Sequence, residues 1–404
     1  MAQHLVVIGA GQAAVQAIQT ARQLGFDGTI TLVGEEVHLP YQRPPLSKTY
    51  LAGSMPRDRL LLKPDGFYQR RRVDLAIGHR AEELDVDKQR IRLDDDRILT
   101  YDQLIIASGG RPRHIDVSGA DLPGVHYLRA IPDVDAIIDS LDSAKELLIV
   151  GAGYIGLEVA AVAVERGLRV TVLEAAERIL ARVVCAEVAQ FYHAYHEQAG
   201  VRILCNAAVS GFKGSDRVVA VETSSGDTFP CDLAIIGIGI VPNVELAQSA
   251  GLDCDNGILV DSCARTADPM IVAAGDCTNH PHALIDANIR LESVQNAVEQ
   301  GKSAAMSLFG QAKEFDAVPW FWSDQYDLKL QIAGLALEYD QIVIRGDPDD
   351  KNFAAYYLSG PRLIAVDAIN SPRDFINAKK LLGARTAVSA AQLADLNVDL
   401  SKLL

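Results

Sequence analysis

An internal duplication constrains the fold of this 404-residue chain more than any other feature. The segment LVVIGAGQAA (5–14) returns as LLIVGAGYIG (147–156), and ITLVGEE (30–36) returns as VTVLEAA (170–176). Each copy ends, after a polar hairpin, in another apolar strand, DQLIIASGGRPR (102–113) or CDLAIIGIGIVPN (231–243). The order strand, glycine turn, helix, strand predicts an α/β fold with two Rossmann-type nucleotide-binding domains.

The two glycine turns carry the first functional prediction. Their glycines allow a tight turn and a close approach of the backbone to a pyrophosphate, which lies at the positive end of the following helix. An acid at the end of the next strand is placed to accept ribose hydroxyls. The predicted nucleotide contacts are Gly9, Gly11, Ala14 and Glu35 in the first copy and Gly151, Gly153, Gly156 and Glu174 in the second, with Ala14 and Gly156 allowing close helix–strand packing.

Two dinucleotides in one chain, without a metal-binding motif, predict electron transfer between two cofactors. A flavin takes two electrons from a nicotinamide and releases them singly, so FAD and NADH are the expected pair. The segment AAGDC (273–277) supports a flavin, because Gly275 lets the backbone pass close to a ribityl chain and Asp276 can accept its hydroxyl protons. The helix that begins near Ser293 would direct its N-terminal amides at the flavin.

Composition excludes several other classes of protein. A net charge of −15 and a pI near 5.0 argue against a nucleic-acid-binding surface. The longest apolar stretch (147–164) contains glycines and Glu158, so no membrane segment is expected, and the first residues leave no room for a secretion signal, which favours the cytoplasm. The six cysteines lack a CxxC pair, and His280 and His282 are expected in a loop, so no metal site is predicted.

The change of pattern along the chain indicates four parts. We expect a first part of an FAD-binding domain at 1–113, an NAD-binding domain at 114–243, the second part of the FAD-binding domain at 244–315 and a smaller α+β C-terminal domain at 316–404. The first copy alone carries an insertion with the stiff segment PYQRPPLSKTYLAG (40–53).

Several motifs together resemble one family. PPLSK, SGGRPR, VGAGYIGLEVAA, GIGIVPN, AAGDC, ESVQNA and PWFWSDQY are similar to the FAD-dependent, NADH-using ferredoxin reductases of bacterial oxygenase and cytochrome P450 systems. The resemblance runs over the whole length. It implies a glutathione-reductase-like fold, with the FAD domain split around the NAD domain, and an enzyme that passes single electrons from FAD to a [2Fe–2S] ferredoxin.

The resemblance also implies roles for single residues. By it the FAD contacts are Ala13, Glu35, Arg43, Lys48, Ala81, Arg129, Asp276, Val294 and Trp322, and Gly239 and Glu158 join the NAD site. Lys48, Glu158 and Trp322 are the implied catalytic residues. Lys48 is expected to pair with Glu158, and Trp322 is expected at the exposed edge of the flavin.

The region after the first helix distinguishes this chain from disulfide reductases of the same fold. Those enzymes place a reactive cysteine pair there, whereas this chain has Arg43, two prolines and Lys48, and its first cysteine is Cys185. Electrons must therefore leave without a protein thiol. The same gap argues against an NADH oxidase or peroxidase. A rubredoxin reductase and an FAD- and NADH-binding signalling protein of the apoptosis-inducing-factor type remain alternatives.

Docking of an acidic ferredoxin requires a local basic patch on this acidic chain. The candidates beside the flavin motifs are Arg290, Lys313 and Lys329. Glu174 is not followed at once by an arginine that could receive a 2′-phosphate, so NADH is expected over NADPH. A monomer or a weak dimer is expected.

Overall fold

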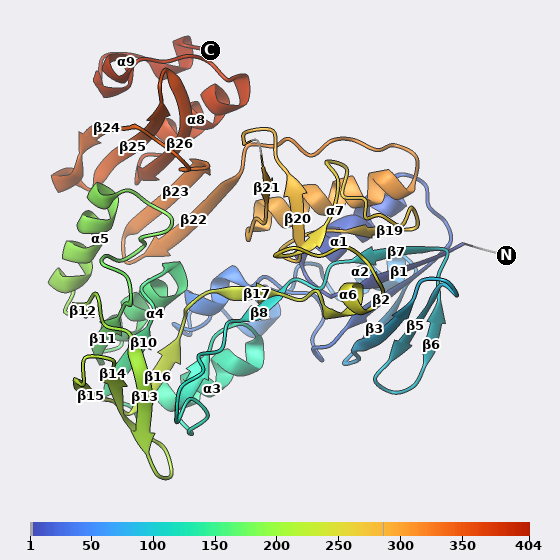
Figure 1. Cartoon of the computed structure of the whole chain (residues 1–404), viewed down its shortest axis with the longest axis horizontal. Coiled ribbons are helices and arrows are strands. Elements are labelled where there is room, and N and C mark those ends of the chain that lie inside the picture. Colours follow the sequence, from blue (N-terminus) through green and yellow to red (C-terminus); the bar gives the residue numbers. More distant parts are fainter. Residues whose placement is uncertain (1–2, 286) are drawn as a thin grey trace. The chain divides into compact units, whose positions relative to one another are not determined.

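A computed structural model of the chain describes residues 3–285 and 287–404. The chain divides into two compact units. Each unit is built from three separate segments, so the chain passes between the units several times (Figure 1). Two of these passes lie in β8 (Gly110–Pro112) and β17 (Ile240–Pro242), which pair with each other. The first unit contains Met1–Gln42, Arg57–Arg111 and Val241–Pro319, and the second contains Arg43–Pro56, Pro112–Ile240 and Trp320–Leu404. The predicted division into four domains remains a prediction.

A five-stranded parallel sheet forms the centre of the first unit. Its strands, in order across the sheet, are β19 (Ile271–Ala273), β7 (Gln103–Ile106), β1 (His4–Ile8), β2 (Thr29–Gly34) and β3 (Val73–Ile77). The first glycine turn joins β1 to helix α1 (Gln12–Gln23), which leads back to β2. This is the β–α–β unit that the sequence predicts.

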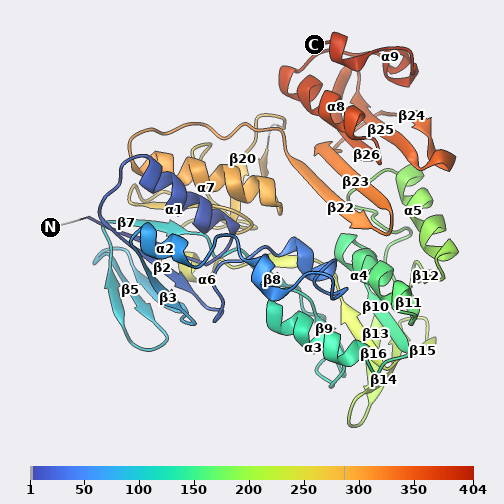
Figure 2. The same cartoon turned by 180° about the vertical axis from the view of Figure 1, so that it is seen from behind.

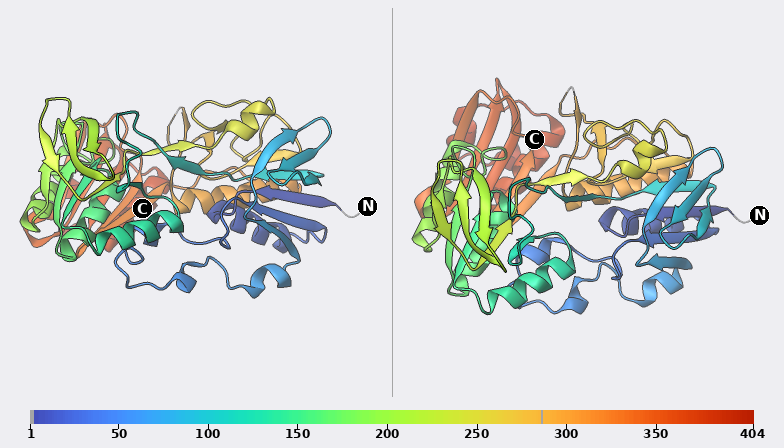
Figure 3. Two further views of the ribbon diagram at one scale, coloured as in Figure 1. Left: turned by 90° about the horizontal axis from the view of Figure 1, so that it is seen from below. Right: turned by 60° about the horizontal axis from the view of Figure 1, so that its bottom comes forward.

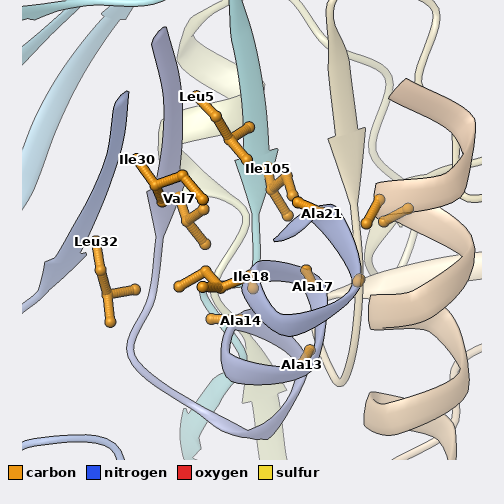
Figure 4. Packing of buried hydrophobic residues seen from close by; sticks show 14 of the residues in the cluster. Leu5, Val7, Ala13, Ala14, Ala17, Ile18, Ala21, Ile30, Leu32 and Ile105 are labelled. Atoms are coloured by element: carbon orange, nitrogen blue, oxygen red, sulfur yellow. The ribbon is translucent and has the colours of Figure 1, made fainter. Parts of the chain in front are cut away.

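Alternating side chains of the sheet build two separate cores. Leu5 and Val7 of β1 face α1 and α7 (Val294–Leu308), as the close view in Figure 4 shows for α1. Val6 and Ile8 face the opposite way, toward the antiparallel sheet that contains β4 (Ala81–Asp85). Successive residues of a strand point to opposite faces, so an unbroken apolar run indicates a sheet covered on both sides.

The remaining elements of the first unit cover this sheet and its edges. They are β5 (Arg90–Leu93), β6 (Ile98–Thr100), β18 (Ile258–Leu259), β20 (Thr278–Pro281), β21 (Asn288–Ile289), the 3-10 helix η2 (Arg57–Leu60), α2 (Gly66–Arg70) and α6 (Glu245–Ser249). Here the structure corrects one expectation. His280 lies in β20 and is 1% exposed, and His282 directly after it is 3% exposed, so this segment is buried and partly strand rather than loop.

The second unit repeats the arrangement of the first. Its parallel sheet has the order β12 (Arg202–Leu204), β11 (Arg169–Leu173), β10 (Glu146–Val150), β16 (Leu233–Ile236) and β9 (Val125–Tyr127). The second glycine turn joins β10 to α4 (Tyr154–Glu165), just as the first joins β1 to α1. A sheet of β13 (Val209–Gly214), β14 (Val218–Thr223) and β15 (Thr228–Pro230) matches the hairpin of the first copy (Figure 3). The other helices of this part are η1 (Pro44–Ser47), α3 (Ile131–Leu141) and α5 (Ala186–Gln198).

An antiparallel sheet occupies the C-terminal part of the second unit. Its order is β22 (Trp320–Gln325), β23 (Leu328–Gly334), β26 (Arg362–Ile369), β25 (Asn352–Ser359) and β24 (Gln341–Asp347). Helix α8 (Pro372–Ala384) packs on β23 and β26, and α9 (Ala390–Ala394) packs on β24 (Figure 2). Two short 3-10 helices, η3 (Pro348–Asp350) and η4 (Leu400–Lys402), complete it. The predicted fold class, two Rossmann-type parts and an α+β C-terminal part, is confirmed.

In the part of the chain that the structure covers, no helix has the length and apolar character needed to cross a bilayer.

The contact between α1 and α7 gives a stability prediction. A Cβ on Gly301 of α7 would lie 2.5 Å from the carbonyl oxygen of Ala13, which is backbone and cannot move aside. Gly301→Ala should therefore destabilise the protein by about 1–3 kcal/mol, the range for overpacking. Urea unfolding of the two variants measures this. The control Gly66→Ala places its Cβ only against the tip of the Arg70 side chain, so it should leave the midpoint unchanged or raise it. Equal losses in both variants would contradict the packing argument.

Candidate functional site

The first glycine turn leaves the N-terminus of α1 accessible. Gly9 has a φ of +97°, and a Cβ there would lie 2.1 Å from the carbonyl oxygen of Ala107, so only glycine fits. Gly11 is the N-cap residue of α1; no described side chain caps this end, and no described atom lies within 4 Å of its Cβ position. The free amides of such a helix end, with space in front of them, fit a pyrophosphate.

Four further predicted FAD contacts of the first unit lie in α1, directly after β2 and at the start of β4. Ala13 and Ala14 are buried in α1, and their small side chains allow the close packing of this helix. Glu35 follows β2, and its exposed carboxylate lies 3.8 Å from the Arg80 guanidinium. Ala81 begins β4.

The segment around Gly275 lies against α1. Gly275 has a φ of +90°, and a Cβ there would lie 3.2 Å from the Cβ of Ala13. The amide of Gly275 and the hydroxyl of Thr278 both donate to Gln300 Oε1, each over 2.8 Å. This buried glutamine of α7 therefore fixes the turn that carries Asp276. Sequence reasoning missed Gln300, because a glutamine within a helix is ordinary.

The N-terminus of α7 is the second helix end that points to a cofactor. Ser293 is its N-cap residue and accepts a hydrogen bond from the amide of Asn296 over 3.0 Å. Val294, a predicted FAD contact, is the first residue of the helix. The partial positive charge of this end suits the negative edge of a reduced flavin.

The second glycine turn repeats the geometry of the first within the second unit. Gly151 has a φ of +101°, and a Cβ there would lie 2.6 Å from the carbonyl oxygen of Gly237. Gly153 is the N-cap residue of α4, again with open space at its Cβ position among the described atoms. A Cβ on Gly156 would lie 2.1 Å from the carbonyl oxygen of Gly151, so the helix packs tightly on its own turn. This site fits the pyrophosphate of a second dinucleotide.

Glu174 does more than the sequence suggested. Its two carboxylate oxygens accept hydrogen bonds from the amides of Ala152, at 2.7 Å, and Ala176, at 2.9 Å. The carboxylate therefore braces the glycine turn itself, and each oxygen retains a lone pair for a ribose hydroxyl. Gly239, the other predicted contact here, is exposed with a φ of +106°.

A buried ion pair is the most distinctive feature of the second unit. Lys48 Nζ lies 2.6 Å from Glu158 Oε2, and the side chains are 15% and 2% exposed. Ser47 Oγ donates to the same oxygen over 2.5 Å, and Ser323 Oγ donates to Oε1 over 2.6 Å. The sequence indicated the Lys48–Glu158 pair but not the two serines.

Burial and these donors act on Glu158 in opposite directions. Burial is the largest influence and leaves the pKa of Glu158 raised, although the charge of Lys48 and the hydrogen bonds from Lys48, Ser323 and Ser47 lower it. A buried carboxylate that accepts one cationic and two hydroxyl donors is suited to remain ionised. The pair thus holds a lysine cation in place while its own net charge stays near zero.

The other predicted flavin contacts of the second unit lie on different elements. Arg43 precedes η1, and its Nη1 donates to the carbonyl oxygen of Arg129 over 2.7 Å. Trp322 lies in β22, half-buried, with its ring 5.7 Å from that of Trp320. It projects from the face of β22 opposite to Ser323, because neighbouring residues of a strand alternate.

The three predicted docking residues differ in exposure and belong to different units. Arg290 is only 12% exposed and pairs with Glu292. Lys313 is exposed in the same unit, and Lys329 is exposed in the second unit, within β23. Burial and pairing make Arg290 the weakest candidate of the three.

Two family models match the chain. The model described as pyridine nucleotide-disulphide oxidoreductase matches residues 3–301, and the model described as reductase C-terminal matches residues 320–404. Rhodocoxin reductase of Rhodococcus erythropolis is 43% identical over 397 residues, which cover 98% of this chain and 93% of that protein.

Solved structures with the same fold include two reductases of similar length. The ferredoxin reductase for the CYP199A2 system from Rhodopseudomonas palustris has a TM-score of 0.97 and 40% identity, covering 99% of both chains. The covalent complex of putidaredoxin reductase and putidaredoxin gives a TM-score of 0.96 and 39% identity, covering 99% of this chain and 98% of that one. The chain therefore has the glutathione-reductase-like fold and belongs to the pyridine nucleotide-disulphide oxidoreductase family, with a reductase C-terminal domain at residues 320–404.

Proposed function

We propose that the protein is an NADH-dependent flavoprotein reductase that passes single electrons from FAD to a [2Fe–2S] ferredoxin serving a cytochrome P450 or another oxygenase. One observation carries the proposal: two open dinucleotide sites occur in a chain whose full-length relatives include reductases of rhodocoxin, of putidaredoxin and of a CYP199A2 system. When bound, FAD accepts a hydride from NADH and releases its two electrons one at a time.

The chain's own residues supply binding and orientation. Gly9, Gly11 and the N-terminus of α1 are proposed to hold the FAD pyrophosphate, with Asp276 and Val294 toward the ribityl chain and ring. Gly151, Gly153 and Glu174 are proposed to hold NADH, with Gly239 as a further proposed contact. Lys48, Glu158 and Trp322 are proposed as the catalytic residues, with the ion pair on the nicotinamide side and the tryptophan near the electron exit.

The state of the cysteines supports an electron exit that uses no thiol. Burial raises the pKa of Cys185 to about 11 and that of Cys231 to about 12, and it also raises the pKa of Cys205, Cys254 and Cys277. A thiol that stays protonated is a poor nucleophile and a poor redox group. All six cysteines are free, which suits the reducing cytoplasm that we propose as the location.

Docking of the ferredoxin is proposed to use exposed cations beside the flavin-binding segments. Lys313 and Lys329 are exposed, as this proposal requires, and Arg290 would have to exchange its bond to Glu292 for one to the partner. Such steering weakens with salt because exposed charges are screened beyond about 8 Å at physiological ionic strength.

Reduction of cytochrome c tests the proposed function directly. The purified holoenzyme with NADH should reduce cytochrome c slowly by itself and at least about tenfold faster with a [2Fe–2S] ferredoxin, since a one-electron carrier must relay the electrons. The KM for ferredoxin should rise with salt, and Lys329→Glu should raise it at low salt. A rate that is independent of ferredoxin would favour a signalling role, and a preference for rubredoxin would favour a rubredoxin reductase.

Another prediction concerns the choice between NADH and NADPH. If Glu174 accepts the ribose hydroxyls of NADH as proposed, its charge repels the 2′-phosphate of NADPH, so kcat/KM for NADH should exceed that for NADPH by at least about tenfold, or about 1.4 kcal/mol. Glu174→Gln should narrow this ratio. Glu177→Gln removes an exposed carboxylate three residues later and serves as the matched control, with the ratio kept. Equal use of both coenzymes by the unmodified protein would contradict the assignment.

A further prediction concerns the Lys48–Glu158 ion pair. Lys48→Met leaves Glu158 buried without its cation, which should destabilise the protein by about 3–5 kcal/mol and slow flavin reduction by NADH in stopped-flow measurements. The double variant Lys48→Met with Glu158→Leu removes both charges, so it should regain much of the stability but not the rate. If Lys48→Met reduced the flavin at the unmodified rate, Lys48 would have no part in hydride transfer.

A further inference from the structure

A chain of buried hydrogen bonds leads away from Glu158 through the C-terminal part. Ser323 Oγ, which donates to Glu158, accepts a hydrogen bond from Gln325 Nε2 over 3.1 Å. Gln325 Oε1 lies 2.8 Å from His196 Nε2 in the last turn of α5. Ser323 and His196 are fully buried and Gln325 is 1% exposed, so these groups depend on one another rather than on water.

The chemistry of the donors gives this chain a single direction. Ser323 has one hydroxyl hydrogen, and the Glu158 carboxylate takes it, so Ser323 can only accept from Gln325. The NH2 group of Gln325 must therefore face Ser323, and its oxygen must face His196. An amide oxygen can only accept, so His196 must carry its hydrogen on Nε2.

The hydrogen bond between Tyr326 and His196 has the same direction. Burial lowers the pKa of His196 to about 4, so its ring is neutral at physiological pH and Nδ1 carries no hydrogen. The hydroxyl of Tyr326 lies 3.0 Å from Nδ1 and can donate to it. Every hydrogen bond from Tyr326 to Glu158 thus points toward the carboxylate.

We propose that His196 is a positioning residue for the Lys48–Glu158 pair, acting through Gln325 and Ser323. By fixing the orientation of the Gln325 amide, the Nε2–H of His196 keeps the Ser323 hydroxyl directed at Glu158. The carboxylate then stays ionised in the conformation that binds Lys48. The functional consequence rests on the proposed role of this pair in hydride transfer, whereas the hydrogen-bond direction does not.

This series of hydrogen bonds holds the Glu158 carboxylate in position and does not conduct protons. An amide such as Gln325 cannot pass a proton on without an unfavourable tautomer, so transfer from His196 to Glu158 is blocked there. The effect of a substitution on the proton affinity of Glu158 should therefore decrease with the number of hydrogen bonds between the altered residue and Glu158. A purely structural role would instead follow the volume removed from the core.

The first test reads the tautomer of His196 in the FAD-bound protein by 15N NMR. The expected spectrum contains one neutral histidine with its hydrogen on Nε2, which is absent from His196→Gln and resists protonation far below pH 6.5. The pH dependence must be read against the titratable neighbours: His193 on α5 and Tyr326 face His196, while Lys48, Tyr154 and Tyr192 lie near Glu158. A hydrogen on Nδ1 would overturn the proposal.

The second test follows the carboxyl group of Glu158 by infrared pH titration, its band being identified by its loss in Glu158→Gln. Ser323→Ala should raise the proton affinity of Glu158 about tenfold, as expected when a carboxylate loses a hydroxyl donor. His196→Phe should raise it by a smaller factor, about threefold, because two neutral bonds intervene. His196→Gln, which keeps an N–H donor near the Nε2 position, should restore most of the unmodified titration.

Matched controls separate positioning from packing. His193 lies one turn earlier on α5 and is not one of these hydrogen-bonded residues, so His193→Gln should leave the titration of Glu158 unchanged. A titration of His196→Phe identical to that of the unmodified protein would overturn the proposal, and if this variant fails to fold, the tautomer and Ser323→Ala still decide. Single-turnover reduction by NADH should slow in Ser323→Ala with the Kd for NADH kept. If the unmodified protein is not reduced by NADH at all, the proposed function fails, while both spectroscopic tests still stand.

Discussion

The carboxylate of Glu158 is the point on which the second unit depends. Burying an isolated charge costs several kcal/mol even after the protein relaxes. Here Lys48 and Ser47 come from the segment that follows the first fingerprint, Glu158 comes from α4, and Ser323 comes from β22. Loss of the Lys48 segment or of α4 would leave a charge without its partner, and loss of β22 would remove one hydroxyl donor from the carboxylate. This explains why Arg43–Pro56 groups with the second unit, although it lies within the first copy of the duplication.

The duplication made the two glycine turns predictable from sequence alone. Their geometry is local, because the strand, the turn and the helix follow one another and the constraint at Gly9 or Gly151 is a backbone conformation that only glycine adopts readily. The acid after the next strand is nearly as local. Both copies therefore have the predicted order of strand, turn, helix and strand, and in each the two strands pair in parallel.

The partners of these residues were not predictable, because they are distant in sequence and have ordinary polar side chains. Ser323 lies 165 residues from Glu158, and His196 lies 129 residues from Gln325. In the strand WFWSDQ, a serine and a glutamine look like exposed alternating residues, yet both are buried. The loop predicted for His280 was wrong for the same reason. Its segment has polar residues, but Gln300 contacts the His280 ring nitrogen over 3.0 Å within the core. Hydrogen bonding to a distant partner reverses what hydropathy indicates.

The cysteines and the segment around Lys48 explain how a member of a family named for disulphide chemistry can dispense with a reactive cysteine pair. A reactive cysteine pair needs thiolates that form near neutral pH, and the burial of most cysteines in this chain pushes their pKa values the other way. The region where related enzymes carry their cysteines instead has the rigid Pro44–Pro45 turn, which places Lys48 against Glu158. A lysine cation whose countercharge is fixed by hydrogen bonds can orient or stabilise a developing negative charge but cannot accept electrons. In a protein built in this way, electrons from the flavin leave without a protein thiol, which agrees with the proposed transfer to an external one-electron carrier.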